Sequence, residues 1–283
     1  MRILRSSTLV LMLNACSVIA LSAGAHAQAA ISISVDVAPP PLPIYDQPPI
    51  PSDGYLWVPG YWAWDQDQVD YYWVPATWVL APEPNLLWTP GYWDWSDGSY
   101  VFNQGYWAPQ VGFYGGINYG YGYTGSGYEG GRWEHGAFFY NRAVNNVTNV
   151  IIKNVYEQVI VVNNTTNNVS YNGGKGGTEA RPTPQEQAVA KERHVEATAL
   201  QKQHAEAASK NRSLFAKDNH GEPPVAATPR AGVFEGVGVS HARKLNAETP
   251  KPEPKAEVPK PEPKVQAPKP EPKAEKEKKP DTL

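Results

Sequence analysis

Between positions 57 and 107 the chain alternates large aromatic and small or polar residues with the two-residue period of a β-strand. The steps Trp62-Ala63-Trp64 and Trp93-Asp94-Trp95 show this period most clearly. Turn-forming residues separate the segments at Asp65 to Gln68, Pro82 to Asn85 and Asp97-Gly98. The pattern predicts a mainly β fold: a small antiparallel meander of aromatic segments, followed by one helix and a disordered Pro-rich tail.

A six-residue unit, aromatic-x-x-Gly/Ala-x-Trp, recurs along this region. Its five copies read WVPGYW from Trp57, WVPATW from Trp73, WTPGYW from Trp88, FNQGYW from Phe102 and YEGGRW from Tyr128. The first positions are 16, 15, 14 and 26 residues apart, and a spacing of about 15 residues accommodates one strand and a turn. Inside the units, Pro59-Gly60 and Pro90-Gly91 predict a β-bulge or a type II turn, because Pro lacks a ladder donor and Gly tolerates positive φ.

The aromatic residues of this region allow two interpretations. In the first, stacked Trp and Tyr rings form the core, and each edge-to-face pair adds about 0.5–1.5 kcal/mol beyond its buried area. In the second, some Trp rings are exposed and stack on sugars or on an apolar partner, while nearby Asp side chains accept hydrogen bonds from hydroxyls. The candidate stacking residues are Trp57, Trp62, Trp64, Trp73, Trp78, Trp88, Trp93, Trp95, Trp107 and Trp133, and the candidate hydroxyl-binding residues are Asp65, Asp67, Asp94 and Asp97.

Over about Tyr55 to Trp133, these copies resemble the bacterial WXXGXW (YXWGXW) repeat-containing exported protein family. The resemblance implies an envelope or secreted protein, and some relatives accompany contact-dependent inhibition systems as accessory proteins. The resemblance assigns no catalytic residue to this chain. Ala76, Phe102 and Tyr128 depart from the motif, so identical geometry in every copy is not implied.

The N-terminus has the pattern of a signal peptide over residues 1–27. Two arginines precede an apolar run from Leu9 to Leu21, and Ala25-His26-Ala27 forms a cleavage site, with Ala29 as the alternative. The run is too short to span a bilayer. We therefore expect export to the periplasm or outer cell envelope of a bacterium, or secretion. The only cysteine, Cys16, lies in a sequence that loosely resembles a lipobox, so membrane contact is expected only if Cys16 is lipidated.

Charge argues against nucleic acid as a partner. Between Arg5 and Arg132 there is no Lys or Arg, whereas the same stretch holds ten Asp and Glu residues. Binding to phosphate backbones requires a basic face, which this half of the chain lacks.

No motif of a catalytic, cofactor or metal site is present, so we expect no enzyme activity, no cofactor and no metal. The segment Asp65 to Asp70 partly matches a calcium loop but lacks its Gly and its distal Glu, which favours a polar hairpin turn. His194 and His204 are ten residues apart and do not have ligand spacing.

The remaining segments differ in composition. We expect a signal peptide at 1–27, a Pro-rich lead-in at 28–53, an aromatic repeat module at 54–135, Asn/Val-rich strands at 136–172, a Gly-rich hinge at 173–182, a helix at 183–210, a linker at 211–247 and a KPEPK-repeat disordered tail at 248–283. The Asn/Val-rich segment predicts strands over Val147–Val155 and Gln158–Asn163, which would enlarge the sheet or remain free for strand addition. The helix should begin with a capping box of Thr183 and Glu186.

Two further stretches have a distinctive composition. Val101 to Tyr128 has no charged residue and many Gly and Tyr, which indicates either an irregular loop or an adhesive surface. Disorder is expected beyond Glu222, where the alternating Lys-Pro and Glu-Pro pairs favour a stiff polyproline II spacer.

These observations indicate a non-catalytic exported envelope protein whose aromatic module binds a carbohydrate or cell-wall surface. The alternative is a structural or accessory envelope protein that acts through protein–protein contacts, made by the segment from Val144 to Ser209. A cell-wall or surface glycan and an envelope protein are therefore the two partner classes to be distinguished.

Overall fold

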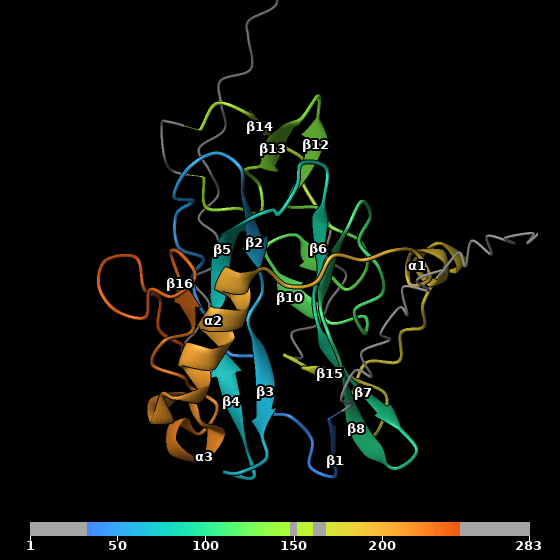
Figure 1. Cartoon of the computed structure of the whole chain (residues 1–283), viewed down its shortest axis with the longest axis vertical. Coiled ribbons are helices and arrows are strands. Elements are labelled where there is room, and N and C mark those ends of the chain that lie inside the picture. The colour runs from blue at the N-terminus through green and yellow to red at the C-terminus, as the bar shows by residue number, and fades with distance from the viewer. Residues whose placement is uncertain (1–32, 148–151, 161–167, 244–283) are drawn as a thin grey trace, which may run out of the picture. The chain divides into compact units, whose positions relative to one another are not determined.

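The computed structural model describes residues 33–147, 152–160 and 168–243 (Figure 1). These residues belong to one compact unit that ends at Arg243. Short strands in small, mostly antiparallel sheets dominate, and the helices are few, as the sequence predicted. No helix in these described ranges has the length and apolar character needed to cross a membrane.

The strands fall into two long hairpins and several short pairs. They are β1 (Ser34–Val35), β2 (Tyr55–Val58), β3 (Tyr61–Asp65), β4 (Asp70–Val74), β5 (Ala76–Leu80), β6 (Leu87–Thr89), β7 (Tyr92–Ser96), β8 (Ser99–Asn103), β9 (Tyr106–Ala108), β10 (Asn118–Gly120), β11 (Tyr123–Thr124), β12 (Gly131–Glu134), β13 (Ala137–Asn141), β14 (Val155–Tyr156), β15 (Tyr171–Asn172) and β16 (Ala227–Thr228). The helices are α1 (Pro184–Val189), α2 (Ala199–Ser209), α3 (Ala216–Asn219) and the 3₁₀ helix η1 (Arg212–Leu214).

Neighbouring copies of the aromatic unit pair with each other in antiparallel fashion. In the first hairpin, β2 to β5, Trp57 lies opposite Trp78 and Trp62 lies opposite Trp73. In the second hairpin, β6 to β9, Trp88 lies opposite Trp107 and Trp93 lies opposite Phe102. Each hairpin therefore contains two copies of the unit, and the first aromatic residue of one copy faces the last Trp of the other.

Each hairpin is interrupted at its centre, where the Gly of the unit lies. The register is the same on both sides of the interruption, so two residues face two residues and no bulge is present. Gly60 and Gly91 do not have positive φ, so the predicted type II turn is also wrong. Glycine is needed here for close approach: a Cβ at Gly60 would lie 2.8 Å from the Ala76 nitrogen and 2.8 Å from the Val74 oxygen.

The turns predicted from the sequence are confirmed. β3 and β4 are joined by a turn after Asp65, whose carboxylate accepts a hydrogen bond from the Gln68 amide at 2.9 Å. Pro82 to Asn85 forms a bend and turn between the hairpins. Asp97 and Gly98 connect β7 to β8 with φ values of 51° and 88°, as the twist of a two-residue hairpin requires.

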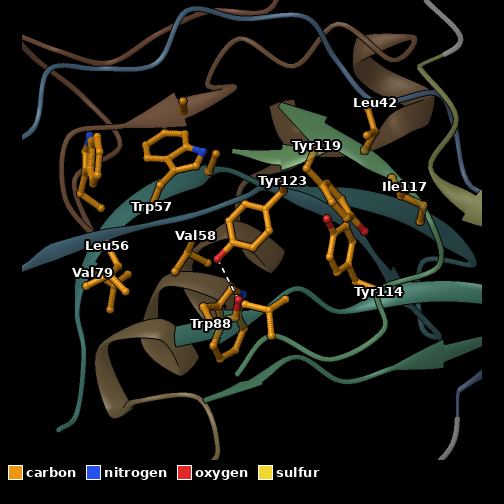
Figure 2. Packing of buried hydrophobic residues seen from close by; sticks show 14 of the residues in the cluster. Leu42, Leu56, Trp57, Val58, Val79, Trp88, Tyr114, Ile117, Tyr119 and Tyr123 are labelled. Atoms are coloured by element: carbon orange, nitrogen blue, oxygen red, sulfur yellow. Dashed lines mark hydrogen bonds between the residues drawn. The ribbon is translucent and has the colours of Figure 1, made fainter. Parts of the chain in front are cut away.

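The two hairpins contact each other through aromatic residues. The Trp93 indole nitrogen donates to the Trp62 carbonyl at 2.8 Å, and the Trp93 ring meets Tyr71 edge-on at 5.3 Å. The predicted aromatic core is thus present. The Gly/Tyr stretch also enters it: Tyr114 and Tyr123 are fully buried, and the Tyr123 hydroxyl donates to the Trp88 carbonyl at 2.8 Å (Figure 2).

Indole nitrogens of the hairpins bind segments that lie far away in the sequence. Trp62 donates to the Pro41 carbonyl at 3.0 Å and Trp78 to the Pro48 carbonyl at 2.9 Å. Trp73 donates to the Ala226 carbonyl and Trp107 to the Gln201 side chain, both at 2.9 Å. Because a buried indole N–H without an acceptor is costly, these bonds fix the flanking segments on the aromatic core.

Two segments that flank the aromatic repeats in the sequence therefore pack on the core. The described part of the lead-in, residues 33–53, packs onto the core and buries Leu42, Tyr45 and Ile50. The prediction of disorder beyond Glu222 is wrong for residues 223–243, where β16 pairs with β5. Small residues let this segment lie close to β5, and its carbonyls supply acceptors that the sequence pattern does not reveal. The tail at 248–283 lies outside the described residues.

The helix expected over residues 183–210 is two helices. Thr183 and Glu186 form the predicted capping box, with Pro184 at the first position of α1. The chain then leaves the helix after Val189, because Val195 exchanges two backbone hydrogen bonds with Trp107, of 2.7 and 2.9 Å. A second capping box, Thr198 with Gln201, starts α2, which packs on β4 (Figure 1).

The Asn/Val-rich strands are only partly as predicted. β14 is two residues long and pairs in parallel with β13. Gln158 to Ile160 is not a strand, while 148–151 and 161–167 lie outside the described residues. The Gly-rich hinge is tied down by the Asn172 amide, which contacts the carbonyls of Gly115 and Ala180 at 3.1 and 3.0 Å.

Candidate ligand-binding groove

Most of the candidate stacking residues have no ring face available to a ligand. Seven of them are buried in the core: Trp57, Trp62, Trp73, Trp78, Trp88, Trp93 and Trp107. The structural interpretation of the Trp residues therefore holds for these seven, and their proposed stacking role is corrected. Burial and pairing with neighbouring aromatic rings leave no room for a sugar on these side chains.

Trp64, Trp95 and Trp133 keep some exposed surface, and the exposed fraction of Trp95 is 37%. Trp64 and Trp95 occupy equivalent positions near the tips of the two hairpins, where each meets a Tyr edge-on: Tyr71 at 4.9 Å and Tyr100 at 4.6 Å. Trp133 donates to the Leu86 carbonyl at 2.9 Å. The structure does not bring these three side chains together with the acidic candidates in one described cavity.

Three of the four candidate hydroxyl-binding residues lie at the turns that close the two hairpins. Asp65 closes the β3–β4 turn, Asp97 lies within the β7–β8 turn, and Asp67 is exposed. The polar hairpin turn predicted for Asp65 to Asp70 is confirmed. Among the described residues, no group of three or more His, Cys, Asp or Glu side chains could hold a metal ion. Asp94 differs from the others, because burial raises its pKa and it lies on the outer face of β7.

The outer faces of the two hairpins are equivalent in register but not in composition. On the first hairpin, Val74 lies in a small apolar cluster with Ala63 and with Ala208 of α2. The C-terminal helices thus seal this face. On the second hairpin, the positions equivalent to Val74 and Ala63 are Asn103 and Asp94. Aliphatic residues under a helix are replaced there by hydrogen-bonding side chains.

A groove of about 260 Å³ lies over this second outer face, between the hairpin and α1. Its lining combines aromatic rings with amide and carboxylate side chains. The principal residues are Tyr92, Asn103, Gln104, Tyr106, Phe113, Glu186 and Gln187. The volume is slightly below the range of about 300–1,000 Å³ that is usual for small-ligand sites.

Neighbouring side chains fix the rings of the groove. Tyr92 meets Phe113 edge-on, with centroids 5.5 Å apart and planes at 82°. Tyr106 stacks on His194 at 3.7 Å and 11°, so one of its ring faces is covered and only the other can meet a ligand. A Cβ at Gly112 would collide with the Tyr106 hydroxyl, so glycine leaves the space that this ring occupies.

Glu186 supports the groove from the α1 side. Its carboxylate accepts hydrogen bonds from the Thr183 amide at 2.8 Å, the Thr183 hydroxyl at 2.9 Å and the Ser126 hydroxyl at 3.0 Å. The side chain is buried. The two Thr183 bonds cap α1, and the Ser126 bond ties α1 to the Gly/Tyr loop.

The two Tyr hydroxyls remain protonated at neutral pH. Burial raises the pKa of Tyr92, and the Asp94 carboxylate adds to the effect. Burial also raises the pKa of Tyr106, with further contributions from Glu186 and Glu192. Both phenols can therefore donate hydrogen bonds, while the amides of Asn103, Gln104 and Gln187 can donate and accept.

Sequence reasoning missed Tyr92 and Tyr106, although both lie inside the repeated unit. They occupy the position between the Gly and the last Trp, and the two-residue period of a strand sends this position to the face opposite the buried Trp. That signal was available in the sequence. The other wall, from Phe113 and α1, depends on long-range packing that the pattern does not encode.

Comparison with known families agrees with the paired arrangement. A family model described as the WXXGXW repeat matches the chain in two copies, over residues 53–79 and 86–108. Each match spans one hairpin and thus two of the short units. The fifth unit, from Tyr128 to Trp133, lies outside both matches and leads into β12, which pairs with β13 instead of with another unit. No curated protein and no solved structure matched the chain. The chain therefore contains two matched WXXGXW repeats, and each matched repeat is one kinked hairpin.

Proposed function

We propose that this protein is a non-catalytic, exported carbohydrate-binding protein, and that the groove on the second hairpin holds the sugar. One observation carries the proposal: the outer face of the first hairpin is apolar and packs against α2, whereas the second hairpin and α1 leave a groove between them that is lined by aromatic rings and amides. Export rests on the N-terminal signal pattern alone.

The lining suits a sugar ring. Sugars have apolar C–H faces, which stack on aromatic rings, and hydroxyls around their edge, which bind planar amides and carboxylates. Tyr92, Tyr106 and Phe113 offer the rings, while Asn103, Gln104 and Gln187 offer the hydrogen-bonding groups. Each hydrogen bond contributes about 0.5–1.5 kcal/mol, so three or four contacts support weak binding of one or two sugar units.

Protein–protein contact is the second candidate function. Within the segment from Val144 to Ser209, Val159 and Leu200 have exposed fractions of 80% and 60%. Exposed single apolar residues are common on protein surfaces, so this observation is weaker than the groove. An accessory role would use these residues and not Tyr92 or Gln187.

A direct test is a glycan array followed by calorimetry with the oligosaccharides that bind. Tyr92→Ala and Gln187→Ala should each weaken binding, by about tenfold for the Tyr and about threefold for the Gln, which correspond to about 1.4 and 0.7 kcal/mol. Gln185→Ala is the matched control on the same helix, because Gln185 does not line the groove and contacts Gln110.

The test also separates the groove from the hairpin tips. Trp95→Ala should leave affinity unchanged if the groove is the site. Loss of binding with Trp95→Ala but not with Tyr92→Ala would move the site to the tip. If no oligosaccharide binds the folded protein, the carbohydrate proposal is wrong and protein partners become the better candidates. Thermal unfolding of each variant shows whether a loss reflects misfolding.

A further inference from the structure

One carboxylate lines the groove, and two more lie next to its lining residues in the sequence or close to its Tyr hydroxyls. Asp94 follows Tyr92 by two residues on the same face of β7, and Glu186 is part of the lining. Glu192 lies just beyond α1, near enough to Tyr106 to raise the pKa of its hydroxyl together with Glu186. The charges that act on both Tyr hydroxyls are thus negative.

Positive charge is sparse on the hairpin side of the groove. Residues 33–131, all described by the structure, contain no Lys or Arg. The nearest basic residues in the sequence are Arg181 and Lys191, which adjoin the lining residues Pro182 and Ala190 and are exposed. Arg193 and Glu192, just beyond α1, are exposed as well. Exposed charges are screened by solvent more strongly than buried ones, so the half-buried Asp94 and the buried Glu186 dominate the field in the groove.

We propose that the groove selects uncharged glycans and rejects those that carry carboxylate or phosphate groups. This inference rests on the proposed function, since it concerns the ligand of the same groove. It narrows the partner from any cell-surface glycan to neutral sugar chains. Polymers of uronic acids and phosphate-linked polymers fall outside it.

The magnitude follows from Coulomb interactions near a protein surface. Glu186 lines the groove and Asp94 is two residues from the lining residue Tyr92, and charges interact over a Debye length of roughly 8–10 Å. Repulsion of this kind should weaken binding by about tenfold for each charged sugar unit held in the groove. Salt should reduce the difference, because it screens the repulsion.

The experiment compares hexamers of glucose, mannose and galactose with hexamers of glucuronate, mannuronate and galacturonate. Calorimetry with the full chain gives affinities at about 20 mM and about 500 mM salt, between which the Debye length falls several-fold. At least one neutral hexamer should bind about tenfold more tightly than its uronate at low salt. High salt should strengthen uronate binding and leave neutral binding unchanged.

Glu192→Gln gives an independent readout, because Glu192 does not line the groove. It should improve uronate binding severalfold and leave neutral binding as it is. Equal or tighter binding of uronates, or uronate binding that salt weakens, overturns the charge selection while leaving carbohydrate binding intact. If none of the six hexamers binds, or if Tyr92→Ala does not affect the ones that do, the proposed function itself fails.

Discussion

Replacement of Gly60 by Ala tests the role of the kink in the repeated hairpin. A Cβ at this position would approach two backbone atoms of the opposite strand, the Ala76 nitrogen and the Val74 oxygen, both at 2.8 Å, and would also collide with the Trp73 ring. Backbone atoms cannot rotate away, so the two strands must separate.

The expected cost is about 3 kcal/mol, at the upper end of the range for overpacking in a core. For a unit of this size, each kcal/mol lowers the midpoint of thermal unfolding by about 2–4 °C, so Gly60→Ala should lower it by about 6–12 °C. Gly91→Ala should cost less, because the nearest atoms there lie at 2.9 to 3.0 Å.

Urea unfolding followed by Trp fluorescence measures these differences directly. Gly98→Asn is the control: Gly98 has a φ of 88° and nothing within 4 Å of an added Cβ, and Asn tolerates positive φ, so its cost should be below about 1 kcal/mol. If Gly60→Ala is as stable as the wild type, or costs no more than Gly98→Asn, close approach is not the reason for glycine in the motif.

Three further predictions concern other parts of the fold. The His204 imidazole accepts a hydrogen bond from the Gly232 amide at Nδ1 and donates to the Pro75 carbonyl from Nε2, and burial lowers its pKa to about 4. As the pH falls, the imidazole is protonated near pH 6.5 in the unfolded chain but only near pH 4 in the folded protein. The free energy of unfolding should therefore be full above pH 6.5 and fall by about 3 kcal/mol towards pH 4. Urea titrations of His204→Gln should not show this loss. Asn172→Asp should cost about 3 kcal/mol, because a carboxylate would then face the carbonyl oxygens of Gly115, Thr178 and Ala180; thermal unfolding checks this, and a stability equal to that of the wild type would show that the amide does not tie down this loop. Acrylamide should quench only a minor part of the Trp fluorescence, from Trp64, Trp95 and Trp133, and quenching of most of the emission would contradict the burial of the other seven.

The local parts of this fold could be predicted from the sequence. The strand period, the turn at Asp97-Gly98 and the capping box at Thr183 each depend on residues that are close together in the sequence. The partner of each strand depends on distant residues. Trp57 could have faced any of the other units, and only the continuous register from Trp57–Trp78 to Trp62–Trp73 shows which one it meets.

The same limit applies to the candidate site. The Trp residues attracted the functional interpretation because they are many and large, yet burial, which the sequence does not state, makes most of them core residues. The lining of the groove joins Tyr92, Phe113 and Gln187, which are far apart in the chain. Sequence could supply the outward direction of Tyr92, but not the helix that faces it.

The indole hydrogen bonds have a consequence for how such repeats multiply. Trp62, Trp73, Trp78 and Trp107 have acceptors outside their own hairpin, on the lead-in, the C-terminal segment and α2. A duplicated hairpin would bring its buried donors without those acceptors. The matched repeat is therefore a unit of sequence but not a unit of folding, and a gene that gains a copy must also gain the flanking chain that completes it. Such repeats cannot be added one after another as in a solenoid, where each unit is completed by its neighbour.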